Sequence, residues 1–235
     1  FPTRRSSDLA LAGRLFPSMV DYPGNVSVVL YTQGCNMRCG YCHNKELIKL
    51  SDCHESLISG SLLEELRKHK KFADHVVITG GEPTLHGDAL MKLCVALKQE
   101  EFSVKLDTNG SNPELLESLL RRRLVDYVAL DYKAMPIHFE KITQSNLFLP
   151  FQKSLHLLIE SGLPFEVRTT VHSELIDRSQ MQNMIQYLEH QNYRGNYYIQ
   201  YFVNGVNTLG KLGFSVRELD KENLSTSSIS VQFRG

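Results

Sequence analysis

Three cysteines within eight residues constrain this chain more than any other feature of its sequence. Cys35, Cys39 and Cys42 have the spacing C-x3-C-x2-C, so one short loop brings three thiolates close enough to hold a single polynuclear metal centre. A structural zinc site takes four ligands, usually as two separated pairs, and a fully ligated [4Fe–4S] cluster takes four cysteines. Three cysteines would leave one iron of such a cluster open, and a substrate can bind to an open iron.

Other readings of these cysteines remain open from spacing alone. His43, Cys53 and His54 could complete a zinc site around a C-x2-C pair, and nearby cysteines also occur by chance. The spacing favours an iron–sulfur site over zinc, and zinc over no metal. We expect Cys94 to pack as a small hydrophobic side chain on the apolar stripe of a helix, and we assign no function to Cys53 in its loop.

Composition limits the class of protein. The chain has 235 residues, of which 42% are hydrophobic, and this is enough to bury the core of one domain. Its 26 basic and 26 acidic side chains balance, so the net charge predicts no attraction to nucleic acid or to an anionic membrane. No apolar run reaches the roughly 18 residues of a membrane span. Clustered cysteines without a disulfide pattern predict a protein of the reducing cytoplasm.

The apolar pattern alternates between strands and helices. Strands are predicted at residues 26–32, 75–79, 103–106, 127–130, 164–171 and 196–203. Helices are predicted near residues 62–71, 88–100, 113–123 and 151–161, and after Asp177. The strands read as continuous apolar runs, which are typical of a parallel sheet covered on both faces.

These six units predict an α/β fold, specifically an open, partial six-unit (β/α) TIM-type barrel, because a closed barrel of eight units takes roughly 250 residues. A doubly wound sheet is the other parallel arrangement, but no G-x-G-x-x-G loop follows the first strand. The barrel is predicted over residues 21–203. Residues 1–20 form an N-terminal extension, of which the first nine look non-native, and residues 204–235 form a C-terminal extension with one further strand near 228–233.

Unusual polar residues follow five of the six predicted strands. They are the cysteine loop, Glu82, Asp107 with Asn109, Asp131 with Lys133, and Arg168. All lie at C-terminal strand ends, which is the face where barrel enzymes build their active sites. The sequence therefore predicts a single site at the mouth of the barrel.

The cysteine loop also carries a family resemblance. With Thr32-Gln33-Gly34 before it and Tyr41-Cys42-His43-Asn44 at its end, it resembles the radical S-adenosylmethionine (SAM) enzymes and, among them, the glycyl-radical-enzyme activases. The resemblance extends over roughly residues 21–203. Within the activases, the sequence is most similar to the activating proteins of anaerobic ribonucleoside-triphosphate reductase. It implies a radical SAM core in which the three cysteines hold a [4Fe–4S] cluster whose open iron binds SAM.

The resemblance also implies which residues bind SAM. Tyr41 would pack against adenine, and the backbone at His43 and Asn44 would contact the adenine edge. Gly80-Gly81-Glu82-Pro83 resembles the GGEP motif of the family, which follows the second strand. Glu82 and this backbone would bind the α-ammonium group of SAM, and the two glycines would let the backbone approach the ligand. A tight turn with a solvated Glu82 is the alternative.

Two further stretches resemble the pyruvate formate-lyase activases. In Asp107-Thr108-Asn109-Gly110 and Asp131-Tyr132-Lys133, the resemblance implies that Asp107, Thr108 and Asp131 hold a monovalent cation beside the SAM carboxylate. Oxygen ligands suit such a hard cation. Asp107, Asn109 and Lys133 would contact SAM, and Arg168 would pair with the SAM carboxylate or with a core acid. A surface Asp131–Lys133 ion pair is the alternative.

The activity implied by the resemblance is reductive cleavage of SAM to a 5′-deoxyadenosyl radical, which abstracts hydrogen from a glycine of a partner enzyme. The expected partners are anaerobic ribonucleoside-triphosphate reductase and a flavodoxin- or ferredoxin-type electron donor. An activase of another glycyl radical enzyme, such as one of the pyruvate formate-lyase type, and a small-molecule radical SAM enzyme are alternatives. A zinc-stabilised binding module is a more remote one.

Overall fold

The structure is a computed structural model that describes residues 9–50, 55–56, 60–217, 219, 224 and 226–234. Within these residues the strands are β1 (Ala10–Tyr22), β2 (Asn25–Thr32), β3 (Glu55–Ser56), β4 (His75–Gly80), β5 (Ser103–Thr108), β6 (Tyr127–Asp131), β7 (Phe165–Val171), β8 (Gly195–Tyr201) and β9 (Ile229–Arg234). The helices are α1 (Gly60–His69), α2 (Gly87–Gln99), α3 (Pro113–Arg121), α4 (Pro136–Thr143), α5 (Phe148–Ser161) and α6 (Arg178–His190). Two short 3-10 helices, η1 (Lys45–Leu47) and η2 (Pro83–His86), follow β2 and β4.

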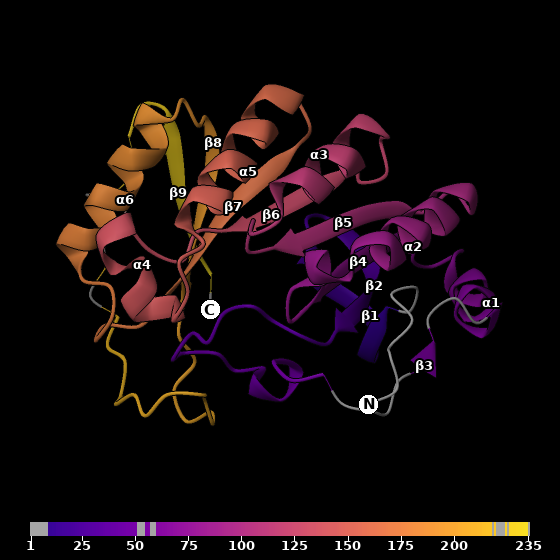
Figure 1. Cartoon of the computed structure of the whole chain (residues 1–235), viewed down its shortest axis with the longest axis horizontal. Coiled ribbons are helices and arrows are strands. Elements are labelled where there is room, and N and C mark those ends of the chain that lie inside the picture. Colours follow the sequence, from indigo (N-terminus) through magenta and orange to yellow (C-terminus); the bar gives the residue numbers. More distant parts are fainter. Residues whose placement is uncertain are drawn as a thin grey trace.

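The described strands form one sheet in the order β3-β1-β2-β4-β5-β6-β7-β8-β9. From β2 to β9 each strand runs parallel to its neighbour, whereas β1 is antiparallel to both β2 and β3. The two ends of this order do not join, so the predicted open, partial barrel is confirmed. The strands fan out in sequence order from β2 to β9, and α2, α3, α5 and α6 cover their outer side (Figure 1).

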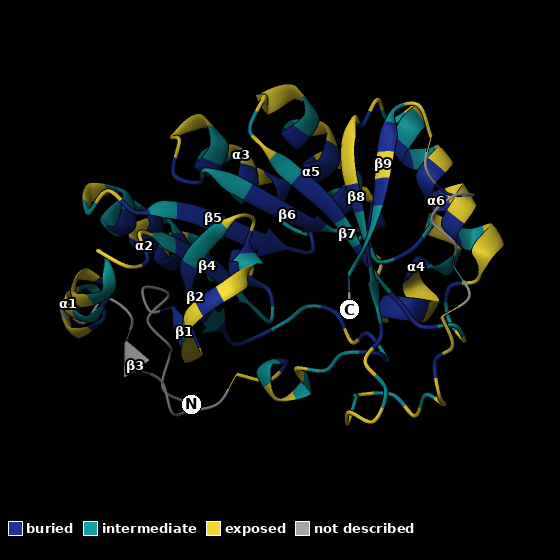
Figure 2. Cartoon of the chain, turned by 180° about the vertical axis from the view of Figure 1, so that it is seen from behind, coloured by how far each residue is buried: buried dark blue, intermediate teal, exposed yellow. Residues whose placement is uncertain are grey.

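Burial explains why these strands read as unbroken apolar runs. Val76, Val77 and Ile78 of β4 are all fully buried, because a parallel sheet inside a layer of helices is covered on both faces. The central strands are mostly dark blue in Figure 2, whereas β1, which pairs with β3 only at Ala10 and Leu11, carries exposed residues. The helix stripes were predicted correctly too: Leu90 and Cys94 of α2 are buried, as is Met181 of α6.

The predicted starts of α3 and α6 have the expected caps. Asn112 accepts a hydrogen bond from the Leu115 amide ahead of Pro113, and Asp177 forms a capping box with Gln180. Both caps follow strand ends at the mouth of the barrel, so the helices begin at fixed points after the site-bearing loops.

The sheet extends beyond the predicted barrel at both ends. Strand β1 occupies a stretch that was predicted to be an extension, and Leu9, the last of the nine residues interpreted as non-native, is buried in the core. The pairing of β1 with β2 contains three register shifts, which destroy the simple alternation that identifies a strand in sequence. Strand β9 confirms the strand predicted near residue 228. Helix α4 was not predicted; its eight residues are too few for a clear stripe.

Candidate active site

The C-terminal ends of the parallel strands surround a cavity of 340 Å³. Its lining includes the predicted site residues Cys35, Cys39, Tyr41, Cys42, His43, Asn44, Gly80, Gly81, Glu82, Asp107, Thr108, Asn109, Asp131, Lys133 and Arg168. Pro83 is the exception, since it lies buried in η2 outside the lining. Residues separated by more than a hundred positions in sequence therefore meet at one place.

The cysteine loop, residues 34–44, crosses the mouth between β2 and η1. The Gly34 amide donates to the Leu47 carbonyl at 2.7 Å, and the Arg38 amide donates to the Thr143 carbonyl at 2.7 Å. The unpredicted helix α4 thus anchors the middle of the loop. In Figure 1 this loop runs below the strand ends as a purple segment.

The three thiols of this loop are free, as is Cys94, while Cys53 and His54 lie outside the described residues. Burial raises the pKa of each loop thiol, that of Cys35 to about 11, and the nearby Lys133 opposes the rise. Such thiols are protonated at neutral pH unless a metal displaces the proton. No three His, Cys, Asp or Glu side chains of the described chain converge on the position of a single metal ion. A cluster does not require that convergence, because each cysteine binds a different iron; the three thiols on one cavity wall fit it.

The two glycines at the end of β4 are required by chain packing. A Cβ on Gly80 would lie 2.3 Å from the backbone nitrogen of Thr32, and a Cβ on Gly81 would lie 2.0 Å from the carbonyl oxygen of Gly34. The amide of Gly81 donates to the Thr32 carbonyl at 2.9 Å, and that of Glu82 to the Gly34 carbonyl at 2.7 Å. These contacts join the β4 loop to the start of the cysteine loop. The sequence analysis predicted that the glycines let the backbone approach a ligand. It missed that a side chain at either position would collide with the backbone of Thr32 or Gly34.

Glu82 connects the loops after β4 and β5. Its side chain is 1% exposed, which excludes the alternative of a solvated turn residue. Oε1 accepts hydrogen bonds from the Thr84 and Thr108 hydroxyls at 2.6 and 2.7 Å and from the Thr84 amide, whereas Oε2 accepts from the Asn109 amide at 2.7 Å. Burial raises the pKa of Glu82, although these donors oppose it. Because Oε2 has only this one protein donor among the described residues, it retains a lone pair for an ammonium group.

Charged side chains of β5, β6, β7 and the loop after β6 form one largely buried network. Arg168 was predicted near a strand end but lies in the middle of β7. Asp107 accepts from Lys105 Nζ at 2.6 Å and from Arg168 Nη1 at 3.0 Å. Asp131 accepts from Arg168 Nε at 2.9 Å and from Lys133 Nζ at 3.1 Å. Burial alone would raise the pKa of Asp131, but Arg168 and Lys133 outweigh it and lower the pKa to about 2. Three cations face two carboxylates, so the network carries one excess positive charge.

Sequence reasoning missed Lys105, although a signal was present. Lys105 and Asp107 are two residues apart on β5, and strand alternation places them on the same face. A lysine inside an otherwise apolar strand needs a partner, and Asp107 was within reach.

The monovalent cation stays a prediction, because its expected ligands have other partners in this structure. Each oxygen of Asp107 and Asp131 already accepts from a cationic side chain, and the hydroxyl of Thr108 donates to Glu82. A further cation would have to share these carboxylate oxygens with Lys105, Lys133 and Arg168, and it would add charge to a network that is already positive. The Asp131–Lys133 ion pair of the alternative is present, but it is mostly buried and is joined to Arg168 of β7 rather than lying alone on the surface.

The cysteine loop also contributes aromatic side chains to the site. Tyr41 is 5% exposed, and His43 packs edge-on against Phe202 with ring centroids 4.8 Å apart. The Tyr41 hydroxyl and His43 Nε2 are buried without a hydrogen-bond partner among the described residues. Burial also lowers the pKa of His43. Uncompensated buried polar atoms are costly, so these two atoms on a cavity wall suit a bound polar ligand.

Seven further lining residues were not predicted: Asp21, Tyr31, Met37, Ile48, Thr79, Thr170 and Gln200. Most lie near the C-terminal ends of β2, β4, β7 and β8, and strand alternation directs them toward the cavity. Polar residues in the last positions of apolar strands were the available signal.

Sequence comparisons agree with this geometry. Residues 29–188 match the radical SAM superfamily. A protein of Methanocaldococcus jannaschii that carries the name of a glycyl-radical enzyme activating enzyme is 34% identical over 174 residues, which are 71% of this chain and 70% of that protein. A pyruvate formate-lyase-activating enzyme of Staphylococcus aureus is 32% identical over 127 residues, and this match spans 52% of the chain but only 44% of that enzyme.

Solved structures share the fold. Streptococcus suis SuiB bound to S-adenosylmethionine superposes with a TM-score of 0.66 at 14% identity, covering 88% of this chain and 50% of SuiB. The enzyme anSMEcpe with bound AdoMet and a peptide gives a TM-score of 0.59 at 17% identity, covering 79% of this chain and 53% of the enzyme. At these identities the likeness concerns the fold alone. No helix among the described residues has the length and apolar character to cross a membrane.

Proposed function

The chain belongs to the radical SAM superfamily, and from that premise we propose that it is a glycyl-radical-enzyme activase whose partner is anaerobic ribonucleoside-triphosphate reductase. One observation carries the proposal: three free thiols, a buried carboxylate and an excess positive charge line the same cavity at the strand ends. The relatives named as activating enzymes support the class of reaction. A flavodoxin- or ferredoxin-type protein is the proposed electron donor.

Cys35, Cys39 and Cys42 would hold the [4Fe–4S] cluster. When bound, the cluster and SAM together supply a 5′-deoxyadenosyl radical that takes a hydrogen atom from glycine. The protein contributes binding and orientation to this chemistry and excludes water from it.

The remaining lining residues suit the functional groups of SAM. Glu82 Oε2 offers a carboxylate lone pair to the ammonium group, and Lys133, with the excess charge of its network, offers a donor to the SAM carboxylate. Tyr41 offers an apolar ring face to adenine, and the backbone at His43 and Asn44 lies beside it on the same wall. Gly80, Gly81, Asn109 and Arg168 act chiefly by holding these groups in place.

The choice of partner rests on sequence similarity and on the open barrel. The cysteine-loop sequence and the overall similarity favour the reductase, and an open barrel leaves the cavity accessible to a glycine carried by another protein. The match to a pyruvate formate-lyase-activating enzyme favours a second candidate, an activase of that type.

Anaerobic mixing of the protein with reductant, SAM and the reductase from the same source tests the proposal. We expect a doublet electron paramagnetic resonance signal from a glycyl radical, and about one 5′-deoxyadenosine for each radical, since one SAM supplies one radical. A signal with a pyruvate formate-lyase type partner and none with the reductase would refute the partner assignment and retain the activase. Stoichiometric SAM use with a small molecule, and no glycyl signal with either partner, would refute the activase.

A further inference from the structure

We propose that residues 202–217, which follow β8 and are called the strap below, position the cysteine loop, and that Gly210 is the positioning residue of this contact. The strap belongs to the C-terminal extension, to which neither the sequence motifs nor the proposed SAM contacts give a role. The proposal requires a metal cluster on the loop but does not depend on which partner enzyme is activated.

Two main-chain hydrogen bonds join the strap to the cysteine loop. The Gly210 amide donates to the Gly40 carbonyl at 2.8 Å, and the Leu209 amide donates to the Cys42 carbonyl at 3.3 Å. Both acceptors belong to the part of the loop that carries the last two cysteines. Gly40 and Cys42 lie outside the described strands, so no strand pairing restrains this part of the loop. In Figure 1 the gold strap runs beside the purple cysteine loop below the barrel.

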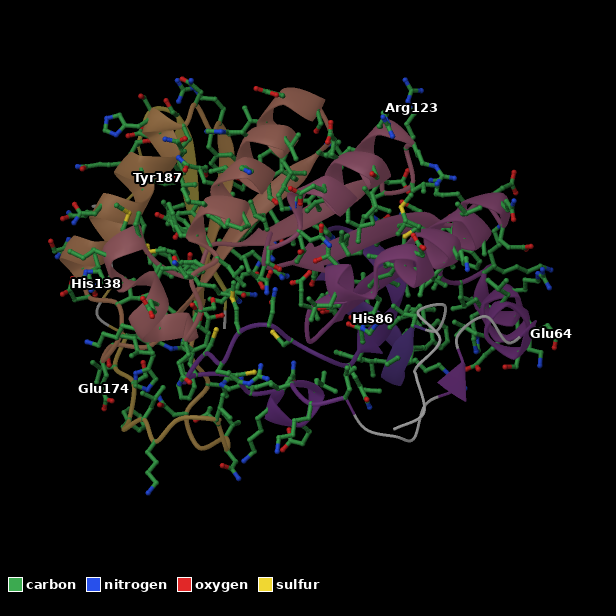
Figure 3. The ribbon with its side chains drawn as sticks, viewed as in Figure 1. Glu64, His86, Arg123, His138, Glu174 and Tyr187 are labelled. Carbon is green, nitrogen blue, oxygen red and sulfur yellow. The ribbon has the colours of Figure 1, made fainter. Side chains whose placement is uncertain are left out.

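The other half of the strap is fixed to the loop after β7. The Gly213 amide donates to Glu174 Oε1 at 3.0 Å, and the Ser173 amide donates to the Ser215 hydroxyl at 3.1 Å. The Val216 amide donates in turn to the Ser173 hydroxyl at 3.1 Å. Figure 3 labels Glu174 on the side of the molecule where the strap lies. The strap therefore bridges two loops that the sheet itself leaves separate.

Aromatic packing fixes the beginning of the strap. The ring of Phe202, which is 6% exposed, lies between those of His43 and His172, with centroid distances of 4.8 and 4.7 Å. His43 directly follows the last cysteine, so this contact restrains the same end of the loop as the two hydrogen bonds.

Steric contact with Gly40 explains why position 210 requires glycine. A Cβ on Gly210 would lie 2.9 Å from Cα and 3.0 Å from the carbonyl oxygen of Gly40, and neither backbone atom can rotate away. The reverse substitution is different, because a Cβ on Gly40 would meet its nearest neighbours only at 4.0 Å. Alanine at position 210 should thus push the strap off the loop, whereas alanine at position 40 should fit.

The consequence concerns the third thiol. Hydrogen bonds to η1 and α4 hold the start and the middle of the cysteine loop, and the strap holds its end. With the strap displaced, Cys42 would be free to move relative to Cys35, and the loop would release a bound cluster more readily.

Gly210→Ala tests the proposal, with Gly13→Ala as the matched control. A Cβ on Gly13 meets nothing within 4 Å, so it reports the effect of the substitution itself. After anaerobic reconstitution, Gly210→Ala should lose iron to a chelator roughly fivefold faster or more, which is the change expected for two lost hydrogen bonds at the weak end of their usual net strength. Gly13→Ala should match the wild type.

Hydrogen–deuterium exchange on the cluster-free proteins gives a second readout. Gly210→Ala should speed exchange in peptides covering residues 35–44 as well as 204–212, with the melting temperature near that of the wild type. Phe202→Leu, which keeps an apolar side chain but removes the ring contacts, should produce a smaller change in the same direction. Unchanged iron release in Gly210→Ala, or faster exchange confined to residues 204–212, would overturn the positioning role.

Discussion

Replacing Asp131 with Asn tests the buried charge network at the strand ends. Asn keeps the shape of the side chain but removes the charge that faces Arg168 and Lys133. In the folded protein the pKa of Asp131 falls from the ordinary 3.8 to about 2. At about 1.4 kcal/mol for each pKa unit, this difference corresponds to about 2 kcal/mol of stabilisation by the ionised carboxylate. The side chain is 25% exposed, so most of this interaction is shielded from solvent.

The direction of the pH dependence follows from the lowered pKa. The carboxylate contributes its full stabilisation above about pH 5, where it is ionised in both the folded and the unfolded chain. This contribution is lost as the pH falls toward 2, because the folded protein must then take up the proton it resisted. The stability advantage of the wild type over Asp131→Asn should therefore shrink by about 2 kcal/mol between pH 5 and pH 2.

Urea unfolding of the cluster-free proteins, followed by circular dichroism at several pH values, measures this advantage. The quantity to compare is the difference in free energy of unfolding between wild type and Asp131→Asn, because the titration of all other groups is common to both proteins and cancels. A difference that stays constant from pH 5 to pH 2, or grows as the pH falls, would refute the assigned ion pairs.

Three further outcomes are expected. Removing any one loop cysteine should abolish iron binding after reconstitution, whereas Cys94→Ala, inside α2, should keep it; equal iron loss would contradict the ligand set. Glu82→Gln should retain iron but weaken SAM binding in calorimetry under argon, because it removes the charge offered to the ammonium group; equal affinity would remove Glu82 from the site. SAM cleavage should not change when potassium is replaced by a bulky organic cation, because the Arg168 network already neutralises the carboxylates; a strong dependence would show that the network rearranges.

Much of the fold was predictable because it depends on local patterns. Strands such as β4 are apolar throughout, and the stripe on α2 repeats with the helical period, so both appear in the sequence directly. Strand β1 was hidden because its bulges break the alternation and because many of its side chains are exposed. Helix α4 was hidden because eight residues give too short a pattern, yet its Thr143 carbonyl anchors the cysteine loop.

The sequence by itself determined which kinds of side chain form the site and that they meet at the C-terminal edge of the sheet. Parallel strands bring their C-terminal ends together whatever the details of packing. It did not determine how those groups are used. Only the tertiary structure showed that Lys105 and Arg168 pair with Asp107, a carboxylate that was predicted to hold a cation. It also showed that position 81 requires glycine because the Gly34 carbonyl lies against it. It alone brought Gly210 to Gly40. Such contacts join segments far apart in the chain, and no local periodicity or spacing encodes the distances between them.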